Sequence, residues 1–116
     1  MIRSALLLAL LSAFPLAHAA TPDLTTISER SGFQATGRYD ETIALCAAFA
    51  QAYPKQVQCI DFGITPEGRP MKALVANNNG VFTPAAAKQA GLPVTLIQGG
   101  IHAGEIDGKD AGFLAL

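Results

Sequence analysis

The chain has 116 residues, of which half are apolar and 15% are charged, and its formal net charge at pH 7 is −1. This composition is that of a globular protein and excludes a disordered or fibrous chain. The small net charge gives no indication of a nucleic acid or an anionic membrane as a partner.

Residues 1–19 have the pattern of a secretory signal peptide. A basic residue, Arg3, is followed by an apolar stretch from Ala5 to Leu16 and by the small-x-small cleavage site Ala17-His18-Ala19. The apolar stretch is too short to span a bilayer, and an uncleaved anchor or a buried helix is the alternative. We therefore expect an exported protein, periplasmic or secreted, with no membrane association after cleavage.

The two cysteines, Cys46 and Cys59, lie thirteen residues apart. Export would bring them into an oxidising compartment, where disulfides persist. This favours a disulfide between them, which the loop-closure model credits with about 3 kcal/mol of stabilisation. Two separate buried thiols are the alternative, because free cysteine packs as a small apolar side chain.

An extended lead-in is expected over residues 20–37, which contain few apolar residues. Residues 38–53 then predict an amphipathic helix, because their larger apolar side chains recur at spacings of three and four. These side chains are those of Ile43, Cys46, Phe49 and Tyr53. Pro54 ends the helix.

The next segments predict a β-hairpin. Residues 57–63 and 70–76 have strand composition, and proline and glycine lie between them as turns prefer. Because the connection is short, the two strands are expected to be antiparallel neighbours.

The rest of the chain predicts a short helix within residues 82–93, a third strand over residues 94–100 and helical structure from about residue 106. The third strand is apolar almost throughout, which is typical of a strand covered on both faces. This order of elements predicts an α/β fold whose sheet needs further strands and cover on its other face. We expect residues 38–116 to be the N-terminal part of a larger, truncated domain, with a complete small domain as the alternative.

His102 and Glu105 follow the predicted third strand directly. In open α/β sheets, ligands bind at the carboxyl ends of strands. Imidazole nitrogen and carboxylate oxygen are zinc ligands, and a catalytic zinc typically has three protein ligands and a water. A spacing of three lets both side chains face one point from a tight loop, in which Gly104 permits backbone angles that other residues resist. His102 and Glu105 are therefore candidate metal ligands.

Other interpretations of this stretch remain open. A lone histidine at a strand end can be merely hydrogen-bonded and partly exposed, and the residue types alone do not decide between this and metal binding. An anion-binding nest is disfavoured, since Asp110 follows Gly108-Lys109 where a phosphate loop needs serine or threonine. Asp107, Lys109 and Asp110 are interpreted as a solvated or helix-capping set, with a supporting role behind the metal ligands as the lesser alternative.

The stretch GGIHAGEIDGKDA, preceded by TPEGRPMKALV and by a helix that ends in AYP, resembles the carboxypeptidase A-like zinc metallocarboxypeptidases. It is most similar to a bacterial branch of that family. The resemblance runs from about Tyr39 to Leu116 and follows the family's order of helix, hairpin and His-x-x-Glu strand end. It implies a mixed twisted sheet flanked by helices, of which only the N-terminal part is present.

The same resemblance implies a zinc metallocarboxypeptidase that hydrolyses C-terminal peptide bonds of peptides or proteins through a zinc-activated water. His102 and Glu105 match the family's first two zinc ligands. The family takes its third ligand, a histidine, its general-base glutamate and its carboxylate-binding arginine from further downstream. No catalytic residue is therefore expected in this stretch, and the chain alone is expected to be inactive although the full-length protein is an enzyme.

Two further comparisons with the family pattern qualify this interpretation. Many animal digestive members have arginine where Gly104 stands, so the peptide specificity stays open. Glu67, Gly68 and Arg69 also match the family, and we assign them to the hairpin turn and not to catalysis. The alternative function is a non-catalytic, carboxypeptidase-like binding module or an inactive fragment.

Overall fold

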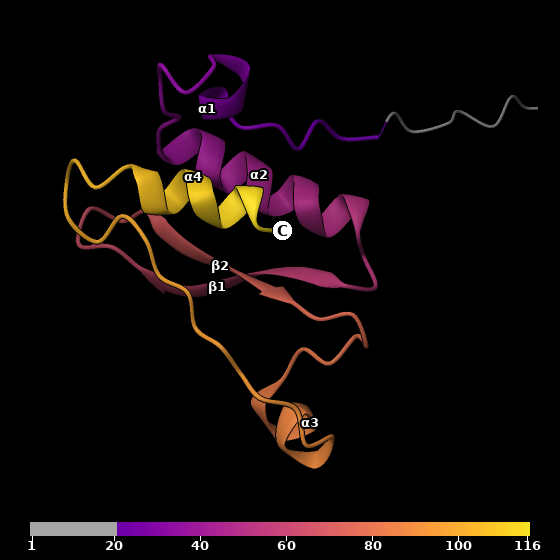
Figure 1. Cartoon of the computed structure of the whole chain (residues 1–116). Helices are drawn as coiled ribbons and strands as arrows, with labels where there is room; N and C mark the ends of the chain where they lie inside the picture. Colours follow the sequence, from indigo (N-terminus) through magenta and orange to yellow (C-terminus); the bar gives the residue numbers. More distant parts are fainter. Residues whose placement is uncertain (1–20) are drawn as a thin grey trace, which may run out of the picture.

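The computed structural model describes residues 21–116, so the signal peptide expected over residues 1–19 lies outside the described residues. The elements follow in the order α1 (Ile27–Arg30), α2 (Tyr39–Ala52), β1 (Val57–Ile64), β2 (Pro70–Ala76), α3 (Pro84–Gln89) and α4 (Asp107–Leu114). Helix α2 packs on the hairpin of β1 and β2, α4 lies beside α2, and α3 lies apart at the far end of a long connection (Figure 1). Within residues 21–116, no helix is long and apolar enough to cross a membrane.

Helix α2 confirms the predicted amphipathic helix. Asp40 and Glu41 lie in its first turn, where the helix dipole favours negative charge. The helix buries Leu45, Cys46 and Phe49 and ends at Ala52, ahead of Pro54. The buried stripe therefore includes Leu45, which the predicted stripe left out.

The hairpin is also confirmed, with β1 and β2 antiparallel in a register that pairs Val57 with Ala76. A β-bulge between Asp61 and Gly63 interrupts the register. At the turn, Gly68 has a φ of +80°, which glycine adopts without strain. The turn assignment of Arg69 agrees with its position, since its guanidinium lies 3.3 Å from the Glu67 carboxylate.

The core is small and lies between α2 and the hairpin. It consists of Leu45, Phe49 and Val57, with Leu24, Leu74 and Phe113 packed around them. The ring of Phe113 on α4 stacks on that of Phe49 on α2, with 5.8 Å between the ring centroids. Aromatic stacking and apolar burial thus attach α4 to the rest of the fold.

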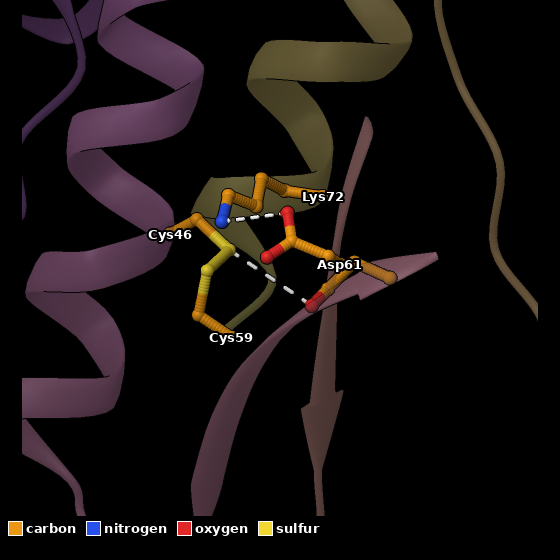
Figure 2. Close-up of a disulfide and its surroundings, with 5 residues drawn as sticks. Cys46, Cys59, Asp61 and Lys72 are labelled. Carbon is orange, nitrogen blue, oxygen red and sulfur yellow. Dashed lines mark hydrogen bonds and ion pairs between the residues drawn. A yellow bond between two sulfur atoms is a disulfide. The ribbon is translucent and has the colours of Figure 1, made fainter. Parts of the chain in front are cut away.

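A disulfide joins Cys46 on α2 to Cys59 on β1 and spans the same interface (Figure 2). The two Cα atoms are 5.4 Å apart, which lies in the usual range for a disulfide. The Sγ of Cys46 also lies 3.9 Å from the Ala73 carbonyl oxygen. This is a packing contact, because a disulfide sulfur carries no hydrogen to donate. Beside the bond, Lys72 and Asp61 form an ion pair at 2.7 Å across the two strands.

The expected extended lead-in is wrong at residues 27–30, where α1 forms. Thr26 accepts a hydrogen bond from the Glu29 backbone N–H at 3.0 Å, and the Glu29 carboxylate accepts from the Thr26 N–H at 2.8 Å. These two bonds are a capping box, which satisfies backbone donors that a helix start otherwise leaves unpaired.

The predicted third strand over residues 94–100 is wrong. This segment is extended but belongs to no sheet, and the sheet of the described residues consists of β1 and β2 alone. Val94, Leu96 and Ile97 are 76%, 85% and 77% exposed. The apolar run predicted a strand covered on both faces, but its side chains are exposed, and a strand also needs a hydrogen-bonded neighbour. The described fold is thus a small α/β arrangement, and the mixed twisted sheet is not seen in it.

The two helices predicted near the C-terminal end are present as α3 and α4. At α3, Thr83 accepts a hydrogen bond from the Ala86 N–H at 3.2 Å, and Pro84 occupies the first turn. Helix α4 begins differently, because the residue before it, Ile106, makes no side-chain capping bond.

Candidate metal centre

His102 and Glu105 form the two ends of a tight turn that leads from the extended segment into α4. The Glu105 backbone N–H donates to the His102 carbonyl oxygen at 3.2 Å. Gly104, the third residue of the turn, has a φ of +94°, which is strained for any residue with a side chain. The glycine between the two candidate ligands therefore allows the chain to reverse direction there.

The turn brings the two candidate ligands together. Nδ1 of His102 lies 2.9 Å from Oε1 of Glu105, and the His102 backbone N–H donates to Oε2 of the same carboxylate at 3.4 Å. Both side chains are open to solvent, with 76% of the His102 side chain and 59% of the Glu105 side chain exposed. The pair is therefore accessible to an ion or a substrate.

The donor atoms of the pair are of types that bind zinc, since an imidazole nitrogen and a carboxylate oxygen are both zinc ligands. Their separation of 2.9 Å is that of a hydrogen bond between the two side chains. A zinc bound by both would replace this contact. Residues 21–116 contain no group of three or more His, Cys, Asp or Glu side chains arranged to hold a metal. The pair alone therefore falls short of the three protein ligands that a catalytic zinc typically has.

Two glycines hold the base of the loop that carries the pair. A Cβ atom on Gly99 would lie 2.5 Å from the carbonyl carbon of Gly108, and one on Gly108 would lie 3.0 Å from the Gly99 Cα. The backbone at the end of the extended segment therefore touches the first turn of α4. This contact was not foreseen from the sequence.

Replacing Gly99 with alanine is expected to lower the free energy of unfolding by roughly 1–3 kcal/mol, because the added methyl group would overlap the backbone of Gly108. Urea unfolding monitored by circular dichroism measures the effect. Gly112→Ala is the matched control, since Gly112 lies in α4, as Gly108 does, and a Cβ there meets nothing within 4 Å. The control is expected to raise stability by up to about 1 kcal/mol. Equal stability of Gly99→Ala and the wild type would contradict the contact.

The interpretation of Asp107, Lys109 and Asp110 as a solvated or capping set is wrong for Asp110, which is 6% exposed. Its Oδ2 accepts a hydrogen bond from the Thr36 hydroxyl at 2.7 Å, and its Oδ1 accepts one from the Lys109 ammonium. The Lys109 ammonium also lies 3.5 Å from the carboxylate of Glu41 on α2. Sequence analysis missed these contacts because Thr36 and Glu41 are distant along the chain.

The environment of Asp110 favours its charged form. Burial raises the pKa of this carboxyl, but the hydrogen bonds from Lys109 and Thr36 and the charge of Lys109 outweigh burial. The net effect is a pKa for Asp110 below its ordinary value of 3.8. Asp110 is therefore an ionised, paired group in the first turns of α4.

A pocket of about 510 Å³ lies against α4, but it does not include the pair. Ile106, Asp107 and Leu114 form one side, and Phe33 and Thr36 form part of the other. Within residues 21–116, His102 and Glu105 thus stand on an open turn beside this pocket and not inside it.

Comparison with family models gave a match over most of the described residues. A family model described as zinc carboxypeptidase matches residues 42–116, which include most of α2, the hairpin and the turn from His102 to Glu105. Comparisons with curated proteins and with solved structures gave no match. Because the matched region covers more than half of the chain, the chain belongs to the zinc carboxypeptidase family.

Proposed function

We propose that this protein is a zinc-dependent metallocarboxypeptidase that hydrolyses C-terminal peptide bonds, and that His102 and Glu105 are two of its zinc ligands. The observation that supports this most directly is the 2.9 Å approach of His102 Nδ1 to Glu105 Oε1 on an exposed turn. Family membership gives the reaction class.

Each part of the turn has a role in this proposal. His102 offers an imidazole nitrogen, and Glu105 offers a carboxylate oxygen, which would offset part of the charge of a divalent cation. The His102 backbone N–H, which donates to Glu105 Oε2 at 3.4 Å, restrains the carboxylate next to the imidazole. Zinc bound there would polarise the scissile carbonyl and lower the pKa of a bound water.

The remaining groups of the reaction are not supplied by the described residues. His102 is the only histidine among residues 21–116, while a catalytic zinc typically has three protein ligands. We therefore propose that residues 38–116 are the N-terminal part of a larger domain with a mixed sheet flanked by helices. The exposure of Val94, Leu96 and Ile97 supports this, because apolar side chains in such a row are ordinarily covered.

We also propose that the protein is exported, to the periplasm or beyond the cell. Residues 1–19 have the order of a signal peptide. A disulfide between Cys46 and Cys59 supports the same proposal, since such bonds persist in oxidising compartments.

The test is an assay of the full-length protein, of which residues 38–116 are the proposed N-terminal part, with two peptides that differ only in a free or an amidated C-terminus, before and after removal of metal. We expect hydrolysis of the free peptide alone, loss of activity with a zinc chelator, and recovery when zinc is added back. Activity that survives in metal-free protein, or equal cleavage of the amidated peptide, would rule the proposal out. Zinc binding without hydrolysis of either peptide would instead identify a non-catalytic carboxypeptidase-like module.

A further inference from the structure

A buried polar network surrounds the first turns of α4. Asp110 is 6% exposed, and its two carboxylate oxygens accept hydrogen bonds from the Thr36 hydroxyl and from the Lys109 ammonium. Thr36 lies in the segment between α1 and α2, 74 residues earlier in the chain. Asp110 therefore ties the start of α4 to the N-terminal part of the fold.

Lys109 extends this network to α2 and α1. Its ammonium lies 3.5 Å from the carboxylate of Glu41, whose side chain is 9% exposed. The same carboxylate accepts the Ile27 N–H of α1 at 2.5 Å and lies 3.8 Å from the Arg30 guanidinium. A Cβ on Gly37 would lie 1.4 Å from Glu41 Oε2, so the Glu41 side chain occupies the space that the glycine leaves free. The network is thus enclosed by packing.

The network is close to the zinc pair along the backbone. Helix α4 begins at Asp107, two residues after Glu105, and its preceding residue provides no side-chain cap. Its first turn touches Gly99 through Gly108, and a Cβ on Gly100 would lie 3.6 Å from the Glu105 carbonyl oxygen. Without a cap, the direction of this first turn depends on packing and on the charged network. A shift of the turn would move Glu105 relative to His102.

From this arrangement we propose that Asp110 is a positioning residue for the zinc pair and acts through the first turn of α4. The inference rests on the proposed function, since it assumes that His102 and Glu105 bind zinc. It adds to that function a supporting contact, between Asp110 and Thr36, that touches neither ligand. Partners that contact a metal ligand directly typically contribute a factor of about 10–100 to metal affinity, and Asp110, which acts through the backbone, is expected to contribute a factor near the lower end of that range.

The test measures the zinc dissociation constant of the protein by competition with a chromogenic chelator, at a temperature where circular dichroism shows each variant to be folded. Asp110→Asn and Thr36→Val are expected to weaken zinc binding by about 10-fold. Thr36→Ser keeps the hydroxyl and is expected to bind as the wild type does. Asp61→Asn is the control for a lost ion pair, because Asp61 pairs with Lys72 on the hairpin and is far along the chain from α4.

A spectroscopic measurement separates positioning from general destabilisation. With cobalt in place of zinc, we expect the visible absorption bands of Asp110→Asn to shift from those of the wild type, because the two donor atoms are displaced. A variant that melts at a lower temperature but keeps wild-type zinc affinity and cobalt bands would overturn the inference and leave a structural role only. If Asp110→Asn does not fold, the contrast between Thr36→Val and Thr36→Ser decides.

The variant His102→Ala tests the proposed function separately from the positioning role of Asp110. If His102→Ala loses zinc and Asp110→Asn does not, the positioning role fails and the zinc site stands. If His102→Ala binds zinc as tightly as the wild type, the pair is not the zinc site and the positioning role fails with it.

Discussion

Replacing His102 with alanine is expected to remove both the bound zinc and the hydrolysis of C-terminal peptide bonds. The variant keeps only the Glu105 carboxylate of the pair, whose present partner is His102 Nδ1 at 2.9 Å. Loss of a direct ligand should lower zinc affinity by more than the roughly 10–100-fold that is typical of supporting partners. Zinc content per chain, measured by elemental analysis after dialysis, and peptidase activity are the two readouts.

The fold is expected to tolerate this change, because 76% of the His102 side chain is exposed. Surface substitutions of this kind usually alter the free energy of unfolding by less than about 0.5 kcal/mol. Glu105→Gln should behave as His102→Ala does, and Glu67→Gln, which changes an exposed carboxylate in the hairpin turn, should keep zinc and activity. Unchanged zinc content in His102→Ala would show that the pair is structural only.

Removing the disulfide with the double variant Cys46→Ala/Cys59→Ala is expected to lower the free energy of unfolding by about 3 kcal/mol. The bond closes a loop with a sequence separation of 13 and joins α2 to β1 next to the small core. Domains of this size are stable by only about 5–15 kcal/mol, so the loss is a large share of the total. The midpoint of urea unfolding is the measurement.

Reduction of the wild type provides the matched control for that variant. In the presence of reductant, the midpoint of urea unfolding of the wild type should fall towards that of the double variant. The midpoint of the double variant should not change. A wild-type midpoint that stays constant, while thiol titration shows both cysteines reduced, would mean that the bond contributes nothing to stability.

The elements that were predictable from the sequence are those with a local signal. The apolar spacing of residues 38–53 located α2, and the proline and glycine between residues 63 and 70 located the hairpin turn. Helix α1 was missed although Thr26 and Glu29 show the spacing of a capping box. The third strand over residues 94–100 was wrong because strand pairing depends on a neighbour that the segment itself does not specify.

The contacts of the candidate site were likewise predictable from the sequence only where they are local. The approach of His102 to Glu105 follows from a spacing of three and an intervening glycine, both of which are visible in the sequence. The bond from Thr36 to Asp110 joins residues 74 apart and was not predictable from either residue. A charged residue in a polar stretch is ordinarily solvated, and the partners that allow Asp110 to be buried come from other parts of the chain.

The contact between Gly99 and Gly108 has an entropic consequence for any ion that the pair binds. It joins the two ends of the loop of residues 100–107, so that the loop is closed when the chain folds. An open loop would have to be ordered on ion binding, at about 1–2 kcal/mol for each residue fixed. On the proposed function, the two donors would form a preorganised chelate. The affinity for the ion would then be governed by the donor atoms and not by the cost of ordering the loop.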